Sequence, residues 1–466
     1  MKNLIILFTL VLMNTTVHSQ CWKIIKSDGS NQTFAIKNDG TLWGWGHNNF
    51  GQIGDGTHGD GTNKSSPTQI GIDSDWETIA VGLYHSVALK TNGTLWTWGL
   101  NLTGELGDGT YDYGTEKYIP TQIGTATDWK SVAAGAYHSL AIKNDGSLWA
   151  WGLNSDGELG DGTSGIGVNK YIPTKIGTAT WTSINAGTYH SVGIKSDGTI
   201  WTWGSNSYGQ LGDGTKISRN IPTQIGSTNN WKTLIAGGYH TIGVKNDGTL
   251  WAWGNNEWGQ LGIGVFEYFK LVPTQIGTDT NWQTLAAGGN HTIAIKNNGS
   301  LWAWGYNSDG EYGNGIYGFN NFAPAQIGTA TNWQDVVTGF AHTVFIKTDG
   351  SLWSTGENWL GQLGDGTFNR RNTPIQINCP GLSIDNITSE SNSIFLYPNP
   401  TRDFIYFYKS ASYLIDKISV TDFTGKKILE QKRDFTKIDV EQLQKGIYYV
   451  HFFSHGKSFD KKFIKQ

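Results

Sequence analysis

The sequence predicts an all-β protein, a seven-bladed β-propeller followed by a small β-sandwich domain. A turn glycine followed by a tryptophan-rich segment recurs seven times at intervals of roughly 50 residues, a period typical of propeller blades or solenoid units. The 63 glycines and 22 tryptophans among 466 residues suit short strands joined by tight turns. No long segment shows apolar residues at helical spacing. The recurring turn glycines are Gly40, Gly93, Gly146, Gly198, Gly248, Gly299 and Gly350.

Residues 1–19 resemble an export signal. Lys2 supplies a positive start, and Leu4–Met13 is an apolar run too short to span a bilayer comfortably. Val17 and Ser19 fit the small-residue pattern before a cleavage site, which leaves Gln20 as the first mature residue. We therefore expect export, with no transmembrane segment elsewhere in the sequence.

Residues 20–378 hold the repeats, and the third copy shows how each unit folds. Ser139–Lys143 and Ser147–Trp151 read as strands, joined by a hairpin turn at Asn144–Gly146. An Asn-x-x-Gly-Gln/Glu-Leu-Gly-Asp-Gly-Thr segment and a later Pro-Thr-Gln-Ile-Gly segment complete about four short strands per unit. Seven such units arranged radially make a propeller, which leaves only short, protected sheet edges.

Three columns of tryptophan run through the copies, represented in the third copy by Trp129, Trp149 and Trp151. Trp149 and Trp151 are two residues apart and share one strand face. A tryptophan stripe can bind a sugar or a base. At repeated strand positions we expect core packing between blades instead.

These segments resemble the regulator of chromosome condensation repeat family. The resemblance rests on Gly-x-x-His-Ser-x-Ala, Asp-Gly-x-Leu-Trp-x-Trp-Gly and Asn-x-x-Gly-Gln-Leu-Gly, and it runs from Trp22 to about Ile377. It implies a seven-bladed propeller. The end copies depart from the pattern: Gln32 stands where the other six have His, and Ser354-Thr355-Gly356 replaces the final Trp-Gly.

One histidine per repeat lies eight residues before each of six turn glycines. Such residues can serve as metal ligands or general bases. Their regular spacing predicts a structural ring instead, in which each histidine bonds within its own blade. These histidines are His85, His138, His190, His240, His291 and His342.

The first repeat extends its Gly-Asp-Gly-Thr loop, where Asp55, His58, Asp60 and Asn63 could hold a hard cation. Their spacing matches no standard calcium loop, so we expect no metal and no cofactor. The recurrent aspartates of this loop, such as Asp108, are expected to brace turns. No serine-nucleophile elbow, phosphate-cradling loop or zinc spacing is present, and a non-enzymatic protein is predicted.

The segments that differ between copies follow Gly-Asp-Gly-Thr and are rich in aromatic residues. Equivalent insertions in a repeat array fall on one face, where rigid loops suit partner binding. The alternative is that these aromatics pad the blade edges. The candidate partner-binding residues are Tyr111, Tyr113, Tyr118, Tyr171, Phe266, Tyr268, Phe269, Tyr317, Phe319 and Phe322, of which Tyr111, Tyr113, Phe266, Tyr268, Tyr317 and Phe319 are preferred.

The two cysteines flank the repeats, Cys21 before the first tryptophan and Cys379 after the last repeat strand. A propeller brings its two ends together, and an exported protein can keep a disulfide. We therefore expect a Cys21–Cys379 bond that closes the ring.

Composition changes after Cys379. Residues 379–393 include a polar stretch expected to be a linker, and residues 394–466 are expected to form a β-sandwich. This tail resembles the C-terminal sorting domain of type IX secretion cargo through Tyr397–Pro400, Asp422–Lys426 and Leu443–Tyr448. The resemblance implies export across the outer membrane of a Gram-negative bacterium. The alternative is a generic adhesive β-domain.

Together these features predict a secreted or cell-surface, non-catalytic binding protein for an extracellular protein or glycan. The formal net charge of -4 argues against a nucleic-acid partner. The resemblance would imply a nuclear exchange factor acting on a small GTPase and chromatin, which the export features oppose. The alternatives are an inhibitor of an extracellular enzyme and a polysaccharide hydrolase or lyase with a metal in the first-repeat loop.

Overall fold

The computed structural model describes residues 21–380, 394–397, 401, 404–409, 415–422, 425–432, 437–454 and 457–465. The expected signal peptide and all but the first two residues of the expected linker lie outside these ranges. The chain divides into two compact units, Met1–Cys379 and Pro380–Gln466. No helix of the described residues is long and apolar enough to cross a membrane.

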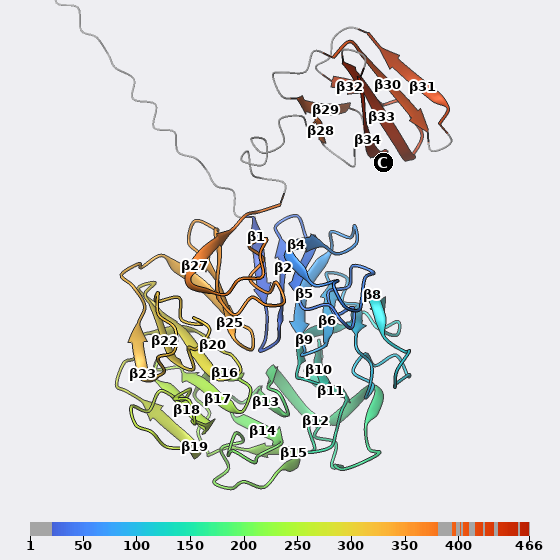
Figure 1. Cartoon of the computed structure of the whole chain (residues 1–466). Helices are drawn as coiled ribbons and strands as arrows, with labels where there is room; N and C mark the ends of the chain where they lie inside the picture. The colour runs from blue at the N-terminus through green and yellow to red at the C-terminus, as the bar shows by residue number, and fades with distance from the viewer. Residues whose placement is uncertain are drawn as a thin grey trace, which may run out of the picture. The chain divides into compact units, whose positions relative to one another are not determined.

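The first unit is a ring of seven four-stranded blades (Figure 1). Blade 1 comprises β1 (Trp22–Lys26), β2 (Gln32–Lys37), β3 (Leu42–Gly46) and β4 (Lys64–Gln69), and blade 2 comprises β5 (Trp76–Val81), β6 (His85–Lys90), β7 (Leu95–Gly99) and β8 (Lys117–Gln122). Blade 3 comprises β9 (Trp129–Ala134), β10 (His138–Lys143), β11 (Ser147–Gly152) and the first half of β12 (Lys170–Ala186). Blade 4 comprises the second half of β12, β13 (His190–Lys195), β14 (Ile200–Gly204) and β15 (Arg219–Gln224).

Blades 5 to 7 follow the same plan, again from consecutive strands. They comprise β16 (Trp231–Ala236), β17 (His240–Lys245), β18 (Leu250–Asn255), β19 (Phe269–Ile276); β20 (Trp282–Ala287), β21 (His291–Lys296), β22 (Leu301–Gly305), β23 (Asn321–Gln326); β24 (Trp333–Thr338), β25 (His342–Lys347), β26 (Leu352–Gly356) and β27 (Arg371–Ile377).

Within each blade the strands pair antiparallel in chain order, and the first strand is innermost. The strand β12 runs without a break from the outer edge of blade 3 into the inner edge of blade 4, which joins those two sheets. The hairpin predicted in the third copy is confirmed: Ser139 pairs with Trp151 and Ile142 with Leu148. Gly146 takes φ +80° at its turn, a conformation that favours glycine.

The ring closes without exchanging a strand, because blade 1 starts at β1 and blade 7 ends at β27. The predicted Cys21–Cys379 disulfide is present and links residues 358 apart in sequence. Blade 1 also contacts blade 7 through the indole of Trp45, whose Nε1 donates to the Gln362 carbonyl at 3.0 Å. Closure therefore depends on side chains and the disulfide rather than on a shared sheet.

The first and third tryptophan columns pack between blades, as predicted. Trp76 and Trp98 of blade 2 lie in one buried cluster with Phe34 and Ile36 of blade 1. The second column is only half-buried, so the core prediction is only partly right for it. Cations cover those indoles instead: in blade 3, Lys143 Nζ lies 4.8 Å from the Trp149 ring centroid.

The repeated histidines bond across blade boundaries, so the prediction of bonds within each blade is wrong. His85 Nε2 lies 2.9 Å from Ser139 Oγ of the next blade, and that hydroxyl donates to the Glu105 carbonyl at 3.0 Å. Because the hydroxyl proton is used on the carbonyl, Nε2 must be the donor to the hydroxyl. The other five histidines repeat this contact, in order around the ring, with Ser191, Thr241, Thr292, Thr343 and Thr33.

The described residues of the second unit form seven strands in two sheets. The strands are β28 (Ile394–Tyr397), β29 (Phe404–Lys409), β30 (Lys417–Asp422), β31 (Lys427–Gln431), β32 (Lys437–Asp439), β33 (Gly446–Ser454) and β34 (Lys457–Lys465). One sheet has the order β28-β29-β32 and the other β31-β30-β33-β34. Ile405, Ile418 and Phe452 lie in their shared buried core. This arrangement is the small β domain that the sequence predicts.

Candidate ligand-binding face

The variable loops emerge at one end of the blades. In an antiparallel four-stranded blade, the turn between the first and second strands and the loop between the third and fourth strands lie at the same end. We call this end the loop face. The opposite end carries the Asp-Gly hairpins and the connections between blades, and we call it the hairpin face.

The exposed aromatic side chains of the propeller's described residues all belong to the loop face. They come from loops between third and fourth strands or, for Phe340, from a turn between first and second strands. Monomeric proteins rarely expose so many large apolar groups on one side without a binding role. These residues are Tyr111, Tyr113, Tyr208, Trp258, Phe266, Tyr268, Tyr317, Phe319, Phe340, Trp359 and Phe368.

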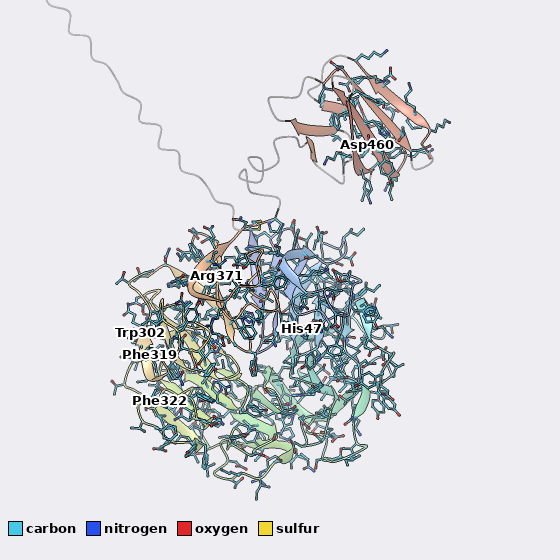
Figure 2. The ribbon with its side chains drawn as sticks, in the orientation of Figure 1. His47, Trp302, Phe319, Phe322, Arg371 and Asp460 are labelled. Carbon is cyan, nitrogen blue, oxygen red and sulfur yellow. A yellow bond between two sulfur atoms is a disulfide. The ribbon has the colours of Figure 1, made fainter. Side chains whose placement is uncertain are left out.

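The ten residues named from the sequence separate into two groups. The six preferred ones are exposed, with Tyr113 at 75% and Phe319 at 71%. The remaining four, Tyr118, Tyr171, Phe269 and Phe322, are half-buried. In Figure 2, Phe319 and Phe322 lie on the outer rim of the ring.

The half-buried group fastens loops to neighbouring blades. Tyr171 of blade 3 stacks on Tyr111 of blade 2 with centroids 4.1 Å apart, and Tyr118 stacks on His58 of blade 1 at 3.7 Å. The ring centroids of Phe322 of blade 6 and Phe266 of blade 5 lie 5.9 Å apart across the boundary between these blades. These contacts hold Tyr111 and Phe266 in defined positions, which lowers the entropy that these two side chains lose on binding.

An inner belt of tyrosines, which the sequence analysis did not single out, lies nearer the channel on the loop face. Tyr84, Tyr137, Tyr189 and Tyr239 each precede the repeated histidine in blades 2 to 5. Neighbouring rings lie 5.9 to 6.4 Å apart. Burial and the adjacent tyrosines raise the pKa of Tyr137 to about 12, so this phenol is neutral at physiological pH.

The belt stops where the residue before the histidine position changes to Asn290, Ala341 and Asn31 in blades 6, 7 and 1. A hollow of about 350 Å³ opens there. It is lined by side chains of four blades, among them Trp258, Tyr306 and Glu357.

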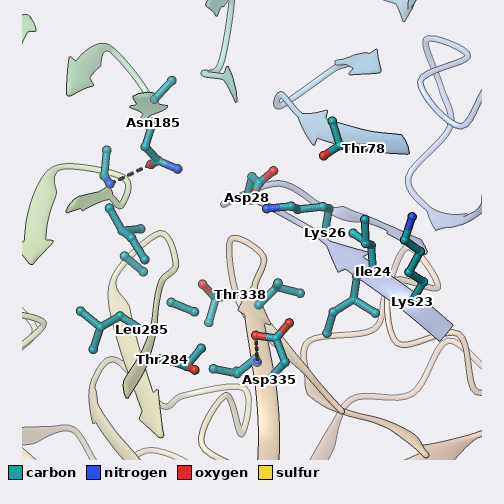
Figure 3. A pocket seen from close by; sticks show the side chains of 18 residues that line it. Lys23, Ile24, Lys26, Asp28, Thr78, Asn185, Thr284, Leu285, Asp335 and Thr338 are labelled. Atoms are coloured by element: carbon teal, nitrogen blue, oxygen red, sulfur yellow. Dashed lines mark hydrogen bonds between the residues drawn. The ribbon is translucent and has the colours of Figure 1, made fainter. Parts of the chain in front are cut away.

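The central channel holds a second cavity of about 370 Å³, lined by innermost strands (Figure 3). Two of its polar side chains are engaged by backbone amides: Asp335 accepts a hydrogen bond from the Val336 amide, and Asn185 accepts one from the Ala236 amide. Burial raises the pKa of Asp335. Lys23, Lys26 and Asp28 add charged side chains of both signs to the wall.

The first-repeat loop uses its candidate metal ligands internally. Asp55 Oδ2 lies 2.6 Å from Lys64 Nζ, and Asn63 Oδ1 accepts the Asn48 amide at 2.9 Å. Asp60 Oδ1 accepts from Asn49 instead. No group of three or more His, Cys, Asp or Glu side chains in the described residues is arranged to hold a metal ion. The expected turn-bracing role is confirmed at Asp108, which accepts from the Thr110 amide and hydroxyl.

Family comparisons agree with the architecture. The regulator of chromosome condensation (RCC1) repeat matches residues 39–89, 92–142, 145–194, 197–244, 247–295 and 298–346. The secretion system C-terminal sorting domain matches residues 395–466. That tail suggests secretion to the cell exterior or surface.

Curated relatives share the repeats. The ultraviolet-B receptor UVR8 of Arabidopsis thaliana is 29% identical over 86% of this chain and 92% of its own length. The mitochondrial RCC1 domain-containing protein RUG3 of the same plant is 32% identical over 73% of this chain and 67% of its own.

Solved structures share the fold. Human WBSCR16 aligns with a TM-score of 0.67 at 21% identity, covering 74% of this chain and 95% of that protein. Prp20p of Saccharomyces cerevisiae aligns with a TM-score of 0.65 at 20% identity, covering 74% and 88%. With six matched repeats on a seven-bladed ring, the chain belongs to the regulator of chromosome condensation (RCC1) repeat family.

Proposed function

We propose that this chain is a secreted or surface-displayed, non-catalytic binding protein whose loop face holds an extracellular protein or glycan. The sorting domain supports the location, because such a tail directs cargo out of the cell. The observation that carries the proposal is the placement of the propeller's exposed aromatics on the loop face alone. Tyrosine and tryptophan are the residues that dominate binding surfaces, since they bury large areas at low entropic cost.

The absence of a catalytic role is supported by how the repeated polar residues are used. The six histidines are buried, and burial lowers the pKa of each to about 3. They are therefore neutral and hydrogen-bonded between blades rather than available to a substrate. The candidate metal loop is likewise engaged with Lys64.

Changing the loop-face aromatics should remove binding. The full chain is screened at neutral pH against arrays of extracellular proteins and glycans, and affinities for the captured ligand are measured for Tyr268→Ala and Tyr317→Ala. We expect at least one variant to weaken binding roughly thirtyfold, the effect of a central aromatic anchor. Both side chains are exposed, so melting temperatures should not change.

Ile72→Ala serves as the matched control. Ile72 is 83% exposed in the connection between β4 and β5, on the hairpin face. Its loss should leave affinity unchanged. Equal losses for all three variants, or a divalent-metal-dependent cleavage of arrayed polysaccharides, would contradict the proposed function.

A further inference from the structure

The hollow at the interrupted tyrosine belt differs chemically from the rest of the loop face. In blades 2 to 5 the belt tyrosines occupy this level, whereas Asn290, Ala341 and Asn31 replace them in the other three blades. The sequence thus removes three phenol rings from one sector and leaves a space of about 350 Å³. That volume is large enough for one long side chain of a partner.

Aromatic side chains form part of the wall of the hollow. The ring centroids of Trp258 and Tyr306 lie 5.1 Å apart in an edge-to-face contact. Phe340 lines the hollow from blade 7 and is exposed. Aromatic faces attract cations, and more strongly where water is excluded.

The polar part of the wall includes two carboxylates and a buried amide oxygen. Asp309 and Glu357 both line the hollow. Asp309 Oδ1 forms an ion pair with Arg370 Nη1 at 3.0 Å. The Glu357 carboxylate has no ion-pair partner among the described residues. The Asn31 Oδ1 atom is buried and has no hydrogen-bond partner there either.

We propose that this hollow binds the cationic end of a basic side chain, arginine first, presented by the extracellular partner. A guanidinium carries donors only, so it suits a site of unsatisfied acceptors. Its plane stacks on aromatic faces, while its edge donates two parallel hydrogen bonds to a carboxylate. The hollow supplies both, with Trp258 and Tyr306 for stacking and Glu357 for the charge.

The carboxylates explain why a cation fits better than a neutral sugar. Asp309 and Glu357 both line the hollow, and burial and the charge of Asp309 raise the pKa of Glu357, so two carboxylates repel each other there. A cation relieves this repulsion, and a sugar hydroxyl does not. Behind the wall, burial raises the pKa of Glu311 to about 8, with Asp309 and Glu357 contributing.

The inference rests on the proposed function, yet small probes test it without any partner. Nα-acetyl-arginine methylamide is titrated into the full chain and followed by saturation-transfer NMR, with the citrulline analogue as a neutral isostere and methyl glycosides as sugar probes. We expect the arginine probe to bind and the citrulline and sugar probes to give no saturable signal.

Two variants locate the site. Glu357→Gln keeps the side-chain shape and should weaken arginine binding roughly tenfold through loss of a charge-assisted hydrogen bond. Ala341→Tyr introduces the residue found at this position in blades 2 to 5, and it should fill the hollow and abolish binding. Glu257→Gln is the matched control, since Glu257 is exposed on the same loop face outside the hollow.

Failure of any arm is informative. Equal binding of citrulline, displacement of arginine by a glycoside, no arginine signal, or an unchanged affinity in Glu357→Gln overturns the inference. If the captured ligand binds Glu357→Gln with unchanged affinity but binds Tyr268→Ala more weakly, the cation site is contradicted and the proposed function stands. If the arginine probe binds but the arrays capture no ligand, the cation site stands and the proposed function is contradicted.

Discussion

The propeller is expected to lose stability steeply as the pH falls below about 6.5. Six histidines with an ordinary pKa of 6.5 have pKa values of about 3 in the folded state, because burial disfavours their charged form. Between these values the unfolded chain binds more histidine protons, so the contribution of the histidines to stability is full above 6.5 and is lost as pH decreases. Six protons correspond to at most about 8 kcal/mol per pH unit.

Three glutamates oppose part of this effect. Burial raises the pKa of Glu105 and Glu158 to about 7 and of Glu311 to about 8, so above an ordinary 4.5 the folded chain holds protons that the unfolded chain has released. Near pH 5.5 they offset up to three of the six histidine protons. The remaining slope is about 4 kcal/mol per unit, enough to unfold a protein of ordinary stability by about pH 4.

Urea unfolding between pH 8 and pH 4, followed by tryptophan fluorescence, measures this slope. His190→Gln is the informative variant, because Gln32 fills the corresponding position in blade 1 and donates from Nε2 to the Gly82 carbonyl at 2.7 Å. It should lower the slope by about one proton, or 1.4 kcal/mol per unit. A stability that is flat from pH 6.5 to pH 4.5 would show that the histidines titrate freely.

Removal of the disulfide should produce the second large loss. The Cys21→Ser, Cys379→Ser double variant frees both chain ends, and loop entropy for a separation of 358 residues gives about 5–6 kcal/mol as an upper value. The effect is concentrated at one boundary, because blades 7 and 1 share no sheet. What remains there includes the His342 contact to Thr33 at 2.9 Å and the Trp45 bond to Gln362.

Guanidinium unfolding with and without reductant checks this expectation. Reductant should lower the stability of the parent chain to that of the double variant and leave the double variant unchanged. Amide exchange should rise first in β1 and β27, the strands next to the two cysteines. Uniform exchange around the ring, or no loss on reduction, would mean that side-chain packing alone closes the propeller.

The repeats make most of the fold readable from the sequence. A turn such as Asn144–Gly146 and a pair such as Trp149 and Trp151 predict strands by local chemistry, and seven copies leave little choice of architecture. Local chemistry does not show which neighbouring blade a side chain faces. The prediction that His85 bonds within its own blade is therefore wrong, since Ser139 of the next blade reaches it only after the blades pack.

The loop face was predictable in part for the same reason. Exposed tips such as Tyr113 depend on loop sequence alone, whereas Tyr171 and Phe322 are held by rings of adjacent blades. The sequence carries a signal for the acidic hollow: the column before the histidine position reads Tyr in four copies and Asn or Ala in three. Its meaning depends on knowing that the blades place this column side by side around the loop face.

The most direct test is amide hydrogen exchange of the full chain with and without the ligand captured on the arrays. The account predicts protection in loop-face segments, including residues 111–118, 265–270 and 316–322, with the hairpin turns around Gly40, Gly93 and Gly146 unaffected. Protection confined to those hairpin turns, or to the innermost strands around the channel, would contradict it.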